Sequence, residues 1–98
     1  MTITKKVEGQ GLEILLKGRL DTTTSPELEA ELAGSIDGVK DLVFDLADLE
    51  YISSAGLRIL LGAQKKMNTQ GSMKIKNVCS EIMEVFEITG FTDILTIE

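Results

Sequence analysis

Two adjacent serines, Ser53 and Ser54, are the side chains of this sequence best placed to do chemistry. They lie where a stretch with strand character passes into a stretch with helical character, just before Gly56. The unpaired backbone N–H groups at the start of a helix attract hydroxyls, carboxylates and phosphates. A serine there is a helix cap, a phosphate acceptor or both, and spacing alone favours the cap for Ser54.

The side chains that many enzymes need are missing from this sequence. There is no His, which excludes His-based acid–base catalysis, the Ser-His-Asp triad and zinc sites with His ligands. Asp21, Asp45 and Asp48 suggest an acidic metal cluster, but the paired acids and the late Lys of a receiver domain are absent. We expect Asp45 to tie down a loop instead. No glycine-rich phosphate loop is present, so the sequence predicts a binding protein rather than an enzyme, without metal or cofactor.

Composition and charge predict one domain, residues 1–98, that works in the cytoplasm. Hydrophobic residues make up 43% and charged residues 27%, a globular balance. The net charge is −6 and the basic residues are scattered, which argues against nucleic acid or an anionic membrane surface as a partner. The single cysteine, Cys79, cannot form an internal disulfide and is expected to be inert. We expect neither a signal peptide nor membrane insertion, because no apolar run approaches the roughly 20 residues that span a bilayer.

Hydrophobic periodicity predicts five strands and three helices around the serine pair. The expected order is strands 3–7 and 12–20 joined in a hairpin, a helix after the loop 21–27, strand 41–46, loop 47–53, helix 54–68, strand 73–78, a helix beginning near residue 80, and strand 93–97. Strands that alternate with helices predict a mostly parallel sheet in an α/β fold of order β-β-α-β-α-β-α-β. The unbroken apolar run 42–44 predicts a central strand covered on both faces.

Hydroxyl residues and glycines mark the expected helix ends. Ser25 precedes a proline and is the expected N-cap of the first helix, with a capping box from Thr24 as the competing interpretation. Gly34 or Gly38 would end that helix, and Gly90 fits the left-handed position after the last helix.

The expected helix 54–68 carries two strips of interest. One is an apolar face that suffices to dock the helix on a sheet: Gly56, Ile59, Leu60, Ala63 and Met67. The other consists of Ser54, Leu57 and Leu61, bordered by Arg58 and Gln64. This second strip is either extra core or a contact surface for another protein, with Ser54 at its end. Gly62 would let a partner or a neighbouring element come close, at a cost of roughly 1 kcal/mol against Ala.

Three motifs, in the right order, resemble those of the STAS domain and, within it, the bacterial anti-sigma factor antagonists. Residues 18–21 (Gly-Arg-Leu-Asp) resemble the family's Gly-x-hydrophobic-Asp, and residues 43–46 (Val-Phe-Asp-Leu) its hydrophobic-Asp-Leu strand. Residues 51–57 (Tyr-Ile-Ser-Ser-Ala-Gly-Leu) resemble its signature, and the corner 89–91 (Thr-Gly-Phe) fits the end of its third helix. The resemblance spans nearly the whole chain. It implies the STAS fold, a single-layer mixed sheet of four to five strands with helices packed against it.

The resemblance also implies a switch controlled by phosphorylation. The serine that is phosphorylated in these antagonists corresponds to Ser54, while Ser53 stands where the family often has Asp. The unphosphorylated protein binds an anti-sigma factor, a GHKL-type serine kinase, and so releases a sigma factor, and a serine phosphatase resets the switch. The implied partner surface consists of Asp21, Ser53, Ser54, Leu57, Arg58 and Leu61. Gly56 and Gly90 are implied cap and turn residues, and the free protein is expected to be a monomer.

Another STAS role remains as the alternative. Such domains also serve as subunits of lipid-transport ATPase complexes and of stress-sensing assemblies. A subunit of that kind would bind its partner without turnover of phosphate on Ser54, so mapping phosphate on the chain separates the two roles.

Overall fold

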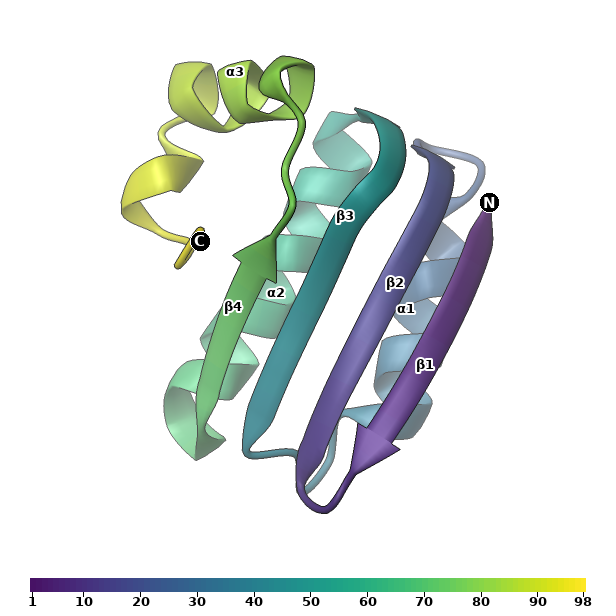
Figure 1. The fold of residues 1–98 in the computed structure, drawn as a ribbon, viewed down its shortest axis with the longest axis vertical. Coiled ribbons are helices and arrows are strands. Elements are labelled where there is room, and N and C mark those ends of the chain that lie inside the picture. Colours follow the sequence, from purple (N-terminus) through teal and green to yellow (C-terminus); the bar gives the residue numbers. More distant parts are fainter.

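The N-terminal hairpin and two further strands form one mixed sheet. In the computed structural model, which describes residues 1–98, β1 (Thr2–Glu8) pairs antiparallel with β2 (Gly11–Leu20). β3 (Asp41–Ile52) and β4 (Ser72–Lys76) then add in parallel, so the sheet order is β1-β2-β3-β4 (Figure 1). Parallel neighbours need a long connection, and the helices between these strands supply it.

Two helices cover one face of the sheet, and a third lies at its end. α1 (Ser25–Ser35) follows β2, α2 (Ser54–Gln70) connects β3 to β4, and both lie behind the sheet in Figure 1. α3 (Ser80–Thr89) lies beyond the upper end of β4 in that view and is followed by a 3-10 helix, η1 (Phe91–Asp93). No helix is long and apolar enough to cross a bilayer. The predicted α/β fold and its element order are confirmed as far as α3.

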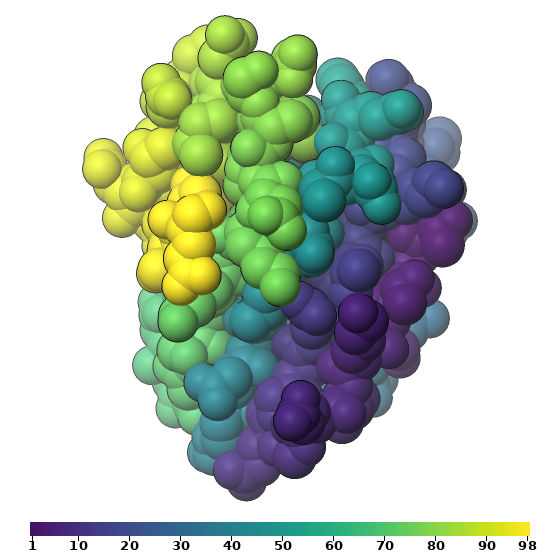
Figure 2. All heavy atoms as spheres, in the orientation of Figure 1, coloured from purple at the N-terminus to yellow at the C-terminus, as the bar shows by residue number.

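The core lies between the sheet and the two helices behind it. Ile14 of β2 and Phe44 of β3 point into it and are fully buried. The prediction that the run 42–44 is covered on both faces is wrong, because Val43 is only half-buried. Since β2, β3 and β4 follow one another in one direction across the sheet, right-handed crossovers place α1 and α2 on the same face. The opposite face, seen in Figure 2, has no helix over its strands.

The expected strand 93–97 is reduced to a single bridge at Ile97. The Ile75 N–H donates to the Thr96 carbonyl at 2.8 Å, and the Glu98 N–H donates to the Ile75 carbonyl at 2.8 Å. η1 ends at Asp93, the first residue of the expected strand, and residues 94–96 form a turn and an irregular segment before the bridge. The sheet therefore has four strands, and the C-terminal segment lies beside β4, as Figure 2 shows.

The strand β3 is longer than predicted and includes most of the expected loop 47–53. It continues to Ile52 in parallel register with β2, pairing Gly18 with Leu49 and Leu20 with Ile52. Two register shifts interrupt this pairing. Leu49 and Ile52 are both buried although they are three residues apart, because the irregular register rotates the chain between them. The broken alternation concealed the end of this strand in the sequence.

The start of α1 also differs from the prediction. Its N-cap residue is Thr24, and Ser25 is the first helical residue, with its side chain buried. The Thr24 side chain does not cap the helix, so the expected capping box does not form. Instead, the Thr24 hydroxyl donates to the Arg19 carbonyl at 2.7 Å and accepts from the Asp21 N–H at 2.9 Å. The hydrogen bonds of the loop thus take precedence over those of the cap.

The glycines at the other helix ends lie close to their predicted positions. α1 has Ile36 as its C-cap, and Gly38 follows with a left-handed φ of 81°, whereas Gly34 lies within the helix. Gly90 is the C-cap of α3, with a left-handed φ of 79°. The predicted turn at Gly90 is therefore confirmed.

Candidate functional site

The carboxyl ends of β2 and β3 bring two of the predicted site regions together. Leu20 pairs with Ile52, and the Ser53 N–H donates to the Leu20 carbonyl at 2.9 Å. Asp21 follows directly on β2, and Ser54 begins α2 shortly after the end of β3. Binding sites of α/β sheets usually lie at the carboxyl ends of adjacent parallel strands. The pairing therefore places Asp21 next to the serine pair.

The cap of α2 is Ser53 rather than Ser54. Ser53 has extended backbone angles (φ −98°, ψ 175°), and its Oγ accepts a long hydrogen bond of 3.5 Å from the Gly56 N–H. Ser54 is the first helical residue, is exposed, and has no side-chain hydrogen bond. The expected cap was thus wrong by one residue, because β3 runs to Ile52 and one extended residue precedes the helix. The Ser54 hydroxyl therefore makes no hydrogen bond within the chain.

Gly56 fixes the first turn of α2 against the sheet. A Cβ atom at this position would lie 2.7 Å from Cγ of Leu20 and 2.9 Å from Cγ1 of Ile52, closer than side chains approach one another. Only glycine lets the helix approach the ends of β2 and β3 so closely. The position of Ser54 is therefore set by packing two residues further along, as expected for a structural glycine.

The Asp21 carboxylate is held by its own loop. Its Oδ1 accepts from the Thr23 N–H at 3.0 Å, the Thr24 N–H at 3.1 Å, the Thr23 hydroxyl at 2.8 Å and the Thr24 hydroxyl at 3.2 Å. These hydrogen bonds, led by the one from the Thr23 hydroxyl, hold the pKa of Asp21 below its ordinary value. Asp21 thus provides a fixed negative charge beside the serine pair.

Arg19 and Tyr51 form a second pair at the same end of the sheet. They are register partners on β2 and β3, and the Arg19 guanidinium lies 4.2 Å from the centre of the Tyr51 ring. Nε of Arg19 is also 3.8 Å from the Asp21 carboxylate. Sequence reasoning missed this pair. The signal was their position in the sequence. Arg19 comes two residues before Asp21 and Tyr51 two residues before Ser53, so the two occupy matching places on neighbouring parallel strands.

The predicted contact strip on α2 divides into core and surface. Leu57 is only 7% exposed and belongs to the core, so for this residue the extra-core interpretation is the right one. Leu61 is half-buried, and Arg58 is exposed one turn after Ser54. The part of the predicted surface that a partner can reach consists of Ser54 and Arg58, with the accessible parts of the half-buried Asp21, Ser53 and Leu61.

The remaining acidic residues make no metal site. Asp45 accepts from the Ala47 N–H at 3.0 Å, within β3, and from Asn77 Nδ2 at 3.1 Å, just after β4. The loop that Asp45 was expected to tie down is not there, because β3 continues through Ala47 to Ile52. Burial raises the pKa of Asp45, but these hydrogen bonds, together with Lys76 and Lys6, outweigh it and leave that pKa lowered. No group of three or more His, Cys, Asp or Glu is placed to hold a metal ion.

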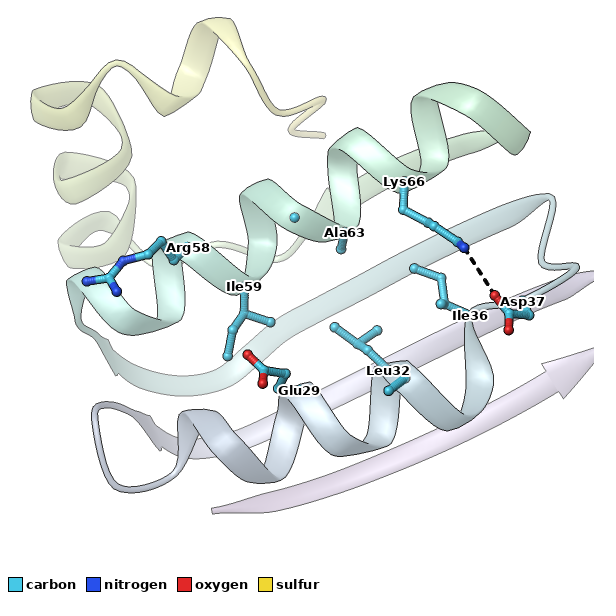
Figure 3. A pocket seen from close by; sticks show the side chains of 10 residues that line it. Glu29, Leu32, Ile36, Asp37, Arg58, Ile59, Ala63 and Lys66 are labelled. Carbon is cyan, nitrogen blue, oxygen red and sulfur yellow. Dashed lines mark ion pairs between the residues drawn. The ribbon is translucent and has the colours of Figure 1, made fainter.

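A groove between α1 and α2 opens close to the serine pair (Figure 3). Its volume is about 390 Å³, and its apolar lining consists of Leu32, Ala33 and Ile36 from α1 and Ile59 and Ala63 from α2. Charged residues border it: Glu29 and Asp37 on one side, Arg58 and Lys66 on the other. The sequence predicted close approach at Gly62, which also lines this groove, but did not predict the groove itself.

The fold and the site motifs define the class of protein. The STAS domain family matches residues 2–98, and the chain belongs to this family. Several curated relatives are antagonists of anti-sigma factors. The anti-sigma-B factor antagonist of Bacillus subtilis is 31% identical over 88% of this chain and 80% of its own length. That of Staphylococcus aureus is 35% identical over 85% of this chain and 79% of its own length. BtrV of Bordetella bronchiseptica, provisionally assigned as an anti-sigma factor antagonist, is 39% identical over 94% of this chain and 80% of its own.

Solved structures with less sequence similarity share the fold. An anti-sigma factor antagonist from Mycobacterium paratuberculosis has a TM-score of 0.87 at 23% identity, covering 98% of this chain and 83% of that one. SpoIIAA has been solved unphosphorylated, with a TM-score of 0.78 at 18% identity, covering 99% of this chain and 87% of that one. The phosphorylated form of SpoIIAA, from Bacillus, has a TM-score of 0.77 at 19% identity, covering 99% and 91%.

Proposed function

We propose that this chain is an anti-sigma factor antagonist, a binding module without catalytic activity that is switched by phosphorylation of Ser54. The observation that carries the proposal is the state of the Ser54 side chain. It is exposed and unbonded at the first position of α2, within the signature segment of the family, while the serine before it does the capping. In its unphosphorylated form the protein binds an anti-sigma factor in the cytoplasm, and a sigma factor is released.

The local structure favours phosphorylation that leaves the fold intact. A phosphate at the start of a helix faces free N–H groups and the positive end of the helix dipole. Ser54 points to solvent, so the added group displaces no core side chain. The fold of this chain is nearly equally similar to the two forms of SpoIIAA, with TM-scores of 0.78 and 0.77, which supports a fold that tolerates the modification.

The same local structure makes phosphorylation costly for binding. A phosphate adds about −1.5 to −2 charges at neutral pH. It would be added next to Asp21, whose lowered pKa keeps it negative. A partner that covers Ser54 would have to remove this charge from water close to another negative charge. A loss of about 2.7 kcal/mol corresponds to binding about a hundredfold weaker.

The partners follow from the proposed switch. The anti-sigma factor is a GHKL-type serine kinase that phosphorylates Ser54, and a serine phosphatase removes the phosphate. The free chain is proposed to be a monomer.

The test is to map phosphate after incubation with ATP and a candidate anti-sigma factor kinase from the same organism. Tandem mass spectrometry should find one phosphate on Ser54, none in Ser54→Ala, and an unchanged site in Ser53→Ala. Phosphate on Ser53 would move the switch to the capping residue and contradict the proposal. Stable binding of a partner with no phosphate on either serine would instead support the role of a constitutive STAS subunit.

A further inference from the structure

Gly62 is the feature of α2 that the fold itself does not explain. A Cβ atom at this position would have no heavy atom within 4 Å, whereas one at Gly56 or Gly71 would collide with neighbours. Its φ is not left-handed either. Glycine within a helix is less stable than alanine, so an exposed helical glycine with free space around it needs another reason. Gly62 lines the groove between α1 and α2, where a side chain would narrow the opening.

The groove has an apolar lining that solvent reaches mainly at Ile59 and Ala33, because Leu32, Ile36 and Ala63 are only 6%, 8% and 5% exposed. Its walls come from Leu32 and Ile36 on α1 and from Ile59 and Ala63 on α2, as Figure 3 shows. At about 390 Å³, the space lies at the small end of the roughly 300–1,000 Å³ that ligand pockets have. An aliphatic side chain from a partner would therefore find apolar surface on both sides.

The charged residues around the groove differ between its two ends, so a bound partner would be oriented by them. At one end, Nζ of Lys66 lies 3.2 Å from the Asp37 carboxylate, so these two charges satisfy each other across the opening. At the other end, Arg58 on α2 and Glu29 on α1 are both exposed and form no ion pair with each other. A carboxylate next to Arg58 and a cation next to Glu29 would complement this end.

This unpaired end of the groove adjoins the proposed switch. Arg58 comes four residues after Ser54, so both lie on the same side of α2, one turn apart. A partner that covers Ser54 therefore reaches the groove without a gap in the contact surface.

We propose that the groove receives an aliphatic side chain from a helix of the anti-sigma factor, and that this helix carries a carboxylate for Arg58 and a cation for Glu29. The inference rests on the proposed function and identifies a second contact of the same partner. The groove anchors the anti-sigma factor, while the charge on Ser54 decides whether it can approach.

The test compares variants of the full chain by calorimetric titration with the purified anti-sigma factor. Gly62→Leu fills the groove and replaces glycine by a better helix former, so the chain should fold at least as well as wild type. It should bind the anti-sigma factor at least about tenfold more weakly. Thr69→Leu is the matched control, because it adds the same side chain at an exposed, uncharged position of α2 that lines no part of the groove.

Ser54→Asp separates failure of the groove from failure of the proposed function. Weak binding by both Gly62→Leu and Ser54→Asp, with Thr69→Leu like wild type, supports the groove. Wild-type affinity of Gly62→Leu together with weak binding by Ser54→Asp overturns the groove and leaves the switch standing. Equal weakening by Thr69→Leu and Gly62→Leu also overturns it. If the wild-type chain does not bind the anti-sigma factor, the proposed function is wrong, and the groove proposal is wrong with it.

The proposed charges are tested by reversal at Arg58. Arg58→Glu should weaken binding severalfold, and the wild-type affinity should fall more steeply with salt than that of the variant. If Arg58→Glu binds as tightly as wild type at low salt, the proposed contact between Arg58 and a carboxylate of the partner is contradicted.

Discussion

The molecule has two adjacent junctions between a strand and a helix, and they use their polar side chains in opposite ways. After β2, the Asp21 carboxylate accepts four hydrogen bonds, and the Thr24 hydroxyl is bonded on both sides. After β3, Ser53 makes one long bond and Ser54 makes none. At the first junction, hydrogen bonds within the loop saturate the polar side chains, whereas at the second junction the Ser54 hydroxyl has no hydrogen bond. The unbonded hydroxyl of Ser54 thus lies beside the rigid, charged loop of Asp21.

The largest expected effect concerns Ser54, whose hydroxyl has no hydrogen bond. Ser54→Asp should weaken binding of the anti-sigma factor by up to about a hundredfold, or about 2.7 kcal/mol, because it adds charge beside Asp21. Titration calorimetry gives the affinity, and circular dichroism with thermal unfolding checks the fold. Unfolding of the variant, or binding as tight as wild type, would contradict the role given to the second junction.

The next effect concerns the packing of that junction. Gly56→Ala should lower the free energy of unfolding by about 1–3 kcal/mol, because its methyl group meets Leu20 and Ile52 at under 3 Å. Gly62→Ala is the matched control, since its methyl group meets nothing, and it should raise stability by up to about 1 kcal/mol. Urea denaturation measures both. Equal stabilities of the two variants would mean that the junction is not held by close packing.

A smaller effect tests the saturated junction through pH. The pKa of Asp21 is lower in the folded chain than its ordinary value, so its hydrogen bonds stabilise the fold above about pH 4 and lose that contribution as the pH falls further. Thermal unfolding of wild type and Asp21→Asn should therefore differ most near neutral pH, and the difference should shrink below about pH 4. A difference that grows toward acid would show that the carboxylate is not held as described.

The smallest effect separates the two serines. Ser53→Ala should cost about 0.5 kcal/mol, at the low end of the range for N-caps, because its hydrogen bond of 3.5 Å is long. Ser54→Ala should leave the free energy of unfolding nearly unchanged, since its side chain has no hydrogen bond to lose. Chemical denaturation resolves the two variants. A larger loss for Ser54→Ala would return the cap to Ser54.

The sequence predicted the elements but not all of their ends. Local patterns were enough for the α/β order, because each strand and helix has its own periodicity. The cap moved from Ser54 to Ser53 because the end of β3 depends on pairing with β2, which is far away in the sequence. The strand expected at 93–97 was reduced to one bridge, because the C-terminal segment meets β4 only at Ile75, through the backbone of Thr96 and Glu98.

The site was predicted where motifs are local and missed where it is built across elements. Ser54, Asp21 and Gly56 lie in short motifs, so the sequence was enough to single them out. Leu57 was ambiguous because the width of the core around α2 cannot be known from one helix. The groove and the contact of Arg19 with Tyr51 each need two elements side by side. For the groove the sequence has no direct signal, and for the pair the signal was only the matching place of the two residues before Asp21 and Ser53.

The two edges of the sheet are protected against unwanted growth in different ways. An unpaired edge strand is a template on which a further chain can add and begin an aggregate. At β4, the bridge from Ile97 takes up part of that edge. At β1, the exposed strand carries Lys5 and Lys6. Lys5 is paired with Glu31 of α1 at 2.7 Å, so the charge of Lys6 is the one that opposes the pairing of β1 with β1 of another molecule. Replacing these two lysines would leave a bare edge of seven residues, and the chain would be expected to form fibrils or larger aggregates more readily.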